Sequence, residues 1–148
     1  PELEILSLRH VPQLTYLNVS QNVKLQTLEF SESNISTVDL SRNVNLENLI
    51  LSDSPISYLD LKNNTKLVFI NAENVGAGLK SIVDNLPYVP VEAEADIWVR
   101  VEAIANSIQD KCRFKNWEAT FEKENKNVLG RERIVQKNSL NYMLPLPR

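Results

Sequence analysis

The sequence predicts an α/β protein, rich in β structure, in which short parallel strands stack into a solenoid that ends in a C-terminal α/β cap. Two observations predict this fold. A 21-residue pattern recurs without gaps over residues 14–34, 35–55 and 56–76, and helix and strand patterns of another kind follow it. A short extended unit can bury its apolar side only against its neighbours, so a repeat of this length favours a stacked architecture.

Each unit contains two halves with apolar residues at L-x-x-L-x-L spacing. The second halves align Leu28, Leu49 and Ile70, and residues 3–13 match a second half with one inserted residue. Each half ends in a period-2 alternation, which predicts a short strand there. Residues 1–76 are therefore expected to form a half coil followed by three repeats.

An asparagine recurs at the same place in every unit, as Asn22, Asn43 and Asn64. A buried asparagine amide can satisfy turn backbone groups that have no partner in a sheet. We expect the three side chains to stack as a ladder at one corner of the coil, and three exposed turn residues are the alternative.

These motifs resemble those of the leucine-rich repeat family, whose unit is L-x-x-L-x-L-x-x-N-x-L. The 21-residue units with two halves are most similar to the bacterial variety, found in internalin-like adhesins and surface proteins of gut commensals. The resemblance implies a right-handed solenoid and an extracellular or cell-surface location, although no export leader is visible in the chain. Many members carry cysteine where this chain has Phe30, Leu51 and Ala72.

Residues 77–121 are expected to cap the last repeat. Apolar residues at helical spacing predict a helix over 77–86, with Leu79, Ile82, Val83 and Leu86 on its buried face. Alternation then predicts a strand over 95–101. A second helix is expected over 103–112, followed by a strand at 118–123. The inward residues of this second helix would be Ile104, Ala105, Ile108 and Cys112.

Residues 122–148 differ in composition, with six basic and three acidic side chains. Their apolar residues predict a partly ordered tail with one strand around 131–136. The basic tail is expected either to dock on the more acidic repeat region or a neighbouring chain, or to remain a solvated extension.

Composition excludes several classes of function. The net charge of −3 argues against a nucleic-acid partner, and no apolar run is long enough to span a membrane. One cysteine, one histidine and three glycines exclude an internal disulfide, a paired-histidine metal motif and a glycine-rich phosphate loop. His10 has no predictable catalytic partner, and Cys112 is expected in the core. We therefore expect no enzyme activity, no catalytic residue, no metal and no cofactor.

Asp39 and Asp60 occupy the same position in successive units, with Asn18 before them. Stacking would bring the two carboxylates to about 5 Å, the spacing of a retaining glycosidase pair, and carboxylates also bind Ca²⁺. Either chemistry needs more groups than these, so a solvated acidic ridge is expected.

The outward side chains of the second-half strands form the candidate binding face. We expect this face to bind a protein or a glycan, with Phe69 and Ile50 as anchors. The alternative is a structural spacer or self-assembly module that forms a homodimer through its open N-terminal coil end. The candidate ligand-binding residues are Ile5, Thr27, Glu29, Asn48, Ile50, Phe69 and Asn71.

Overall fold

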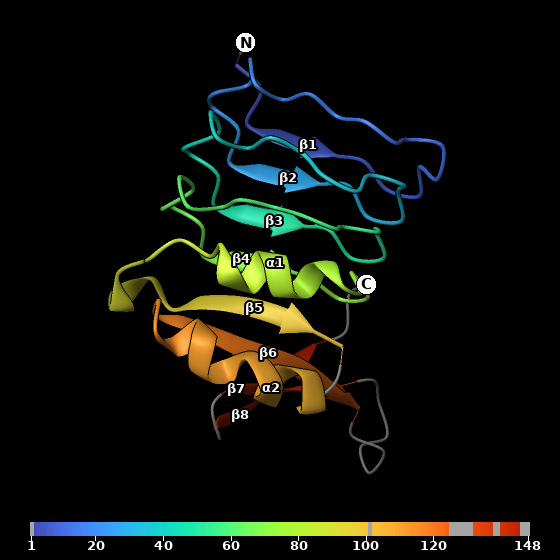
Figure 1. Ribbon diagram of the computed structural model, residues 1–148. Helices are drawn as coiled ribbons and strands as arrows, with labels where there is room; N and C mark the ends of the chain where they lie inside the picture. Colours follow the sequence, from blue (N-terminus) through green and yellow to red (C-terminus); the bar gives the residue numbers. More distant parts are fainter. Residues whose placement is uncertain (1, 101, 125–131, 138–139, 146–148) are drawn as a thin grey trace.

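The computed structural model describes residues 2–100, 102–124, 132–137 and 140–145, and these contain one eight-stranded sheet (Figure 1). The strands lie side by side in chain order, β1 to β6 being parallel and β7 and β8 antiparallel. The predicted α/β class is thus confirmed. The strands are β1 Ile5–Ser7, β2 Thr27–Glu29, β3 Asn48–Ile50, β4 Phe69–Asn71, β5 Ala95–Val99, β6 Trp117–Glu124, β7 Glu132–Lys137 and β8 Leu140–Pro145.

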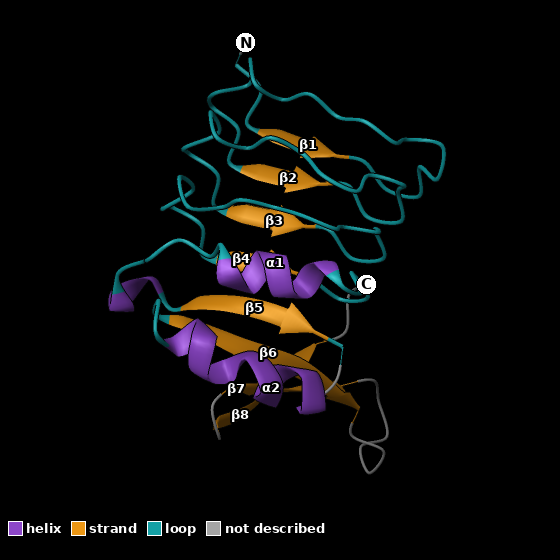
Figure 2. Ribbon diagram, viewed as in Figure 1, coloured by secondary structure: helices purple, strands orange, loops and turns teal. Residues whose placement is uncertain are grey.

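Two α-helices lie on one side of this sheet, α1 (Gly78–Asp84) in front of β4 and α2 (Glu102–Arg113) in front of β6 (Figures 1 and 2). A short 3₁₀ helix, η1 (Val91–Ala93), precedes β5. The core lies between the sheet and a second layer made of the helices and the first halves of the repeat units. The other face of the sheet, called the outer face below, carries no helix among the described residues.

The repeat places equivalent residues in one column across the sheet. Leu28 pairs in register with Leu49, and Leu49 with Ile70, and all three are fully buried. Leu6 and Ile97 continue the column on either side. The predicted column of buried apolar residues is therefore confirmed. It forms because a period of 21 residues returns each leucine to the same side of the next strand.

The first halves of the units are not strands, contrary to the expectation. Residues 14–19, 35–40 and 56–61 form neither strand nor helix, and their leucine, isoleucine and valine side chains pack in or against the core. At the end of each segment, a side-chain oxygen of Asn18, Asp39 or Asp60 accepts the backbone N–H two residues later, at 2.9–3.0 Å. These Asx turns bend the chain where a ladder would have to continue.

The asparagine ladder is confirmed for two of its three members. Asn43 and Asn64 are fully buried, and the amide nitrogen of each donates to two backbone carbonyls of the preceding unit at 2.9–3.0 Å. Asn22 is half-buried and takes part through its backbone carbonyl, which accepts from Asn43.

Helix α1 follows the third unit and stacks on its first-half segment, where the first half of a fourth unit would lie. The backbone N–H of Leu59 donates to the Ser81 hydroxyl, and that of Leu61 to the carbonyl of Asn85, at the end of α1. Ile82 and Val83 are buried as predicted. In α2, Ala105 and Cys112 face the core, but Ile104, expected inward, is 36% exposed.

The described residues of the tail contain more strands than the one expected. β6 extends to Glu124, past the predicted boundary at residue 122, and β7 matches the strand expected around 131–136. β8 was not predicted. The proposed docking of the basic tail depends on side chains outside the described residues. No helix in the described part of the chain has the length and apolarity to cross a bilayer.

Candidate ligand-binding face

All seven predicted ligand-binding residues lie together on the outer face. The strand register joins them into two rows, and alternation along each strand points both rows away from the core. The first row is Ile5, Thr27, Asn48, Phe69 and Asp96, and the second is Ser7, Glu29, Ile50, Asn71 and Trp98.

An aromatic pair forms the most apolar part of this face. The rings of Phe69 and Trp98 meet edge to face, with centroids 5.9 Å apart and an interplanar angle of 70°. Both side chains are half-buried. Ile50 on β3 lies diagonal to Phe69 in the strand register, and Asn71 stands between Ile50 and Trp98. A packed aromatic pair loses little conformational freedom when it binds a partner, so the face carries a preorganised anchor.

Sequence reasoning missed Trp98 and Asp96 as members of this face. The alternation predicts a strand over 95–101 with Ala95, Ile97, Val99 and Val101 on one side. Ala95, Ile97 and Val99 are buried as expected, and Val101 lies outside the described residues. Nothing in the sequence gives the register of that strand against β4, because residues 77–94 carry no repeat. The alternation alone could have indicated that Trp98 faces outward.

Glu29, expected to be accessible, is covered by its neighbours and is only 7% exposed. Its carboxylate accepts from the Ser7 hydroxyl and the Arg9 guanidinium, each at 2.6 Å. Burial alone raises the pKa of Glu29, but the hydrogen bonds from Ser7, Arg9 and Ser31 outweigh it and hold the pKa below its ordinary value. Glu29 therefore stays ionised and paired, and it organises the β1 end of the face.

His10 and Cys112 lie outside the two rows of the outer face. His10 is exposed at a turn, where its Nδ1 lies 2.8 Å from the Glu32 carboxylate. Burial raises the pKa of Cys112 to about 12, with a contribution from Glu118, so its thiol is protonated and inert. In the described part of the chain, no three His, Cys, Asp and Glu side chains gather to hold a metal ion.

Comparison with known proteins gave no further lead. No family model, curated protein or solved structure matches this chain. Function is therefore inferred from the geometry.

A second aromatic pair lies on the cap, where Tyr88 and Phe114 also meet edge to face at 5.9 Å. The ammonium of Lys115 lies 5.7 Å from the centroid of the Tyr88 ring, so a cation already occupies a face of this pair. The pair on the outer face has no such cation in the described structure, and each of its rings has a polar neighbour in its own row, Asn48 beside Phe69 and Asn71 beside Trp98. It is the better anchor for a partner.

Proposed function

We propose that the chain is a non-catalytic binding module that presents its outer face to a protein or a glycan. The observation that carries this proposal is the Phe69–Trp98 pair with Ile50 on the adjacent strand β3, set among polar side chains. Aromatic and aliphatic anchors surrounded by polar groups are typical of binding hot spots. Thr27, Asn48 and Asn71 add hydroxyl and amide groups that can orient a ligand.

We further propose that residues 1–76 are a leucine-rich repeat solenoid of the bacterial 21-residue type, and that the protein acts at a cell surface. The leucine columns in parallel register and the asparagine ladder support the repeat assignment. The location rests on the motif resemblance alone.

The double substitution Phe69→Ala/Ile50→Ser is expected to lower the affinity for a partner at least about tenfold, because it removes two of the anchors. The partner would be identified by screening the purified protein on arrays of glycans and of extracellular proteins. The affinity of wild type and variant would then be measured by biolayer interferometry.

Tyr88→Ala/Phe114→Ala is the matched control, since it removes the other aromatic pair. Its affinity should stay within about twofold of wild type. Undiminished binding by the Phe69→Ala/Ile50→Ser variant, with circular dichroism showing a folded protein, would remove the site from the outer face.

Self-assembly is the second candidate function, and the first coil favours it. Among the described strands, β1 pairs only with β2, and the core-facing Leu6, Leu14 and Leu17 are half-buried where their counterparts in later units are buried. A second copy could cover this coil end and the edge of β1.

Self-assembly predicts that the mass measured by light scattering doubles as protein concentration rises. Leu3→Lys adds a charge at the exposed coil end and should restore the monomer mass. A monomer at all concentrations would eliminate this alternative and leave the outer-face proposal unchanged.

A further inference from the structure

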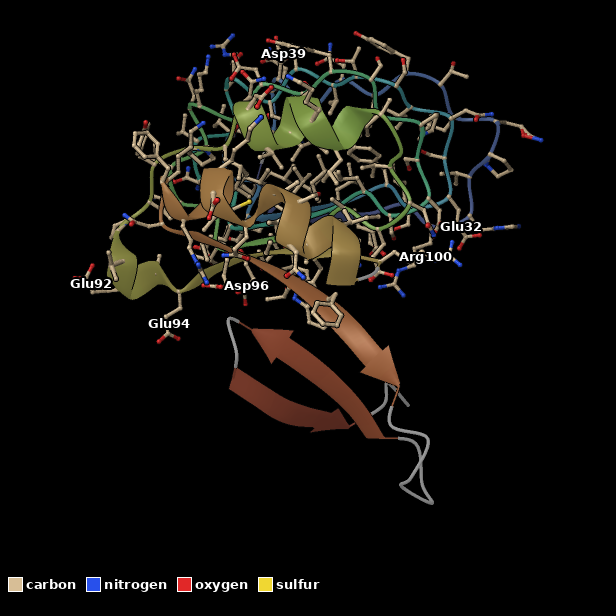
Figure 3. All side chains as sticks on the ribbon, turned by 60° about the horizontal axis from the view of Figure 1, so that its bottom comes forward. Glu32, Asp39, Glu92, Glu94, Asp96 and Arg100 are labelled. Atoms are coloured by element: carbon tan, nitrogen blue, oxygen red, sulfur yellow. The ribbon has the colours of Figure 1, made fainter. Side chains whose placement is uncertain are left out.

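A hollow with a volume of about 480 Å³ lies on the opposite side of the molecule from the outer face. The first-half segments and their turns form it, and Figure 3 shows one of its lining residues, Asp39, on the far side of the fold from Asp96. This volume falls in the range of small-ligand sites, roughly 300–1,000 Å³. The hollow shares no residue with the outer face.

Two carboxylates and no cationic side chain line this hollow. Asp39 and Asp60 occupy adjacent units, and in the described structure no ion pair joins either of them to a lysine or an arginine. Each uses one carboxylate oxygen for its Asx turn. Asn18 makes the same turn in the unit before, so the turn needs a side-chain oxygen but no charge.

Two exposed tyrosines line the same hollow, and their repeat position lies two residues before that of the aspartates. Tyr16 and Tyr58 line the hollow and are 71% and 54% exposed. Thr37 holds the equivalent position in the unit between them and lines the hollow as well. The repeat therefore accepts a small polar residue at a position where the chain presents large aromatic rings.

We propose that this hollow binds an organic cation, an alkylammonium or guanidinium group, between Tyr16 and Tyr58. The charge of the ligand is stabilised by Asp39 and Asp60, and its carbon atoms contact the tyrosine rings. Aromatic rings attract cations through their electron-rich faces, and carboxylates add charge-assisted hydrogen bonds. The site is separate from the proposed outer-face function and does not depend on it.

A neutral glycan is the main competitor, because tyrosine rings and hydroxyl-binding side chains also suit sugars. The charge favours the cation, since a neutral ligand gives no reason for two carboxylates in adjacent units that have no ion-pair partner among the described residues. The cation can be a free polyamine or an arginine side chain on a partner, and both present the same chemistry.

Isothermal titration calorimetry with three probes tests the proposal. The probes are spermidine, the capped peptide acetyl-Gly-Arg-Gly-amide and neutral maltohexaose, each up to about 10 mM. Two variants take their substitutions from equivalent positions in the repeat, so both are expected to fold. Asp39→Asn/Asp60→Asn removes the charge but keeps the turns, and Tyr16→Thr/Tyr58→Thr removes the rings. Glu92→Gln/Glu94→Gln changes the net charge equally at an exposed site elsewhere and is the control.

We expect a cationic probe to bind, each hollow variant to weaken it about tenfold, and the control to change it less than about twofold. Binding of spermidine alone indicates a free polyamine, and binding of the peptide alone indicates an arginine-bearing partner. The proposal is overturned if neither cation binds, if only maltohexaose binds, if one of the two hollow variants leaves affinity unchanged, or if the control loses as much as they do.

Discussion

Gly78→Ala is expected to destabilise the protein by at least about 3 kcal/mol. Gly78 begins α1 and packs directly on the third repeat unit. A Cβ atom there would lie 1.8 Å from the carbonyl oxygen of Ile56 and 2.5 Å from its carbonyl carbon. Both are backbone atoms, so no side-chain rotation can relieve the clash. Either α1 or the 56–61 segment must move, and the cap would separate from the repeats.

Gly76→Ala provides the comparison two residues away. Gly76 has a φ of +65°, and an added Cβ would meet no atom within 4 Å. This substitution introduces backbone strain of about 1 kcal/mol without a clash. Urea denaturation of both variants checks the prediction. Equal stability losses would mean that conformational freedom, rather than the contact with Ile56, explains the glycine at 78.

The sequence predicts the apolar frame well because the frame depends on a local rule repeated without gaps. Once Leu28, Leu49 and Ile70 share a position in the unit, any regular stacking of the units puts them in one column. The ladder of Asn43 and Asn64 follows from the same periodicity. The helix face of Ile82 and Val83 was also predictable, since α1 must cover the last unit.

The strands predicted from the alternation in the first halves were wrong. A period-2 pattern shows that the chain is extended and which side is buried, but it contains no information about backbone partners. Asn18, Asp39 and Asp60 take one backbone N–H each for their turns. Aspartate and asparagine compete in this way with ladder hydrogen bonds, and the three residues were visible in the sequence as a column.

The candidate site was predictable only as far as the repeat extends. Phe69 and Ile50 could be placed because β3 and β4 follow the 21-residue register. Trp98 reaches the same face through a connection of different length, so its contact with Phe69 could not be foreseen. The burial of Glu29 depends on partners in the neighbouring strand and its turn, which a pattern of apolar residues does not specify.

Asn43→Ala is expected to cost about 2–3 kcal/mol, because it removes a buried link between two repeat units. The amide nitrogen of Asn43 donates to the carbonyls of Val19 and Asn22 at 3.0 and 2.9 Å, inside a fully buried corner. Both carbonyls also accept a backbone N–H, from Asn22 and Leu25. The loss is therefore one hydrogen bond at each carbonyl plus a small cavity.

Asn43→Asp tests how much the hydrogen bonds of Asn43 contribute to stability, because it changes them while it keeps the volume of the side chain. An aspartate of the same shape would place an oxygen where the amide now donates to two carbonyl oxygens, so it should destabilise more than alanine does. Asn45→Ala is the control, since the Asn45 amide donates to Val23 at an exposed site and should cost less than about 1 kcal/mol. Guanidinium denaturation orders the three variants. If Asn43→Asp proves as stable as Asn43→Ala, the asparagine fills space without joining the units, and the strand ladder and the leucine columns hold the repeats together.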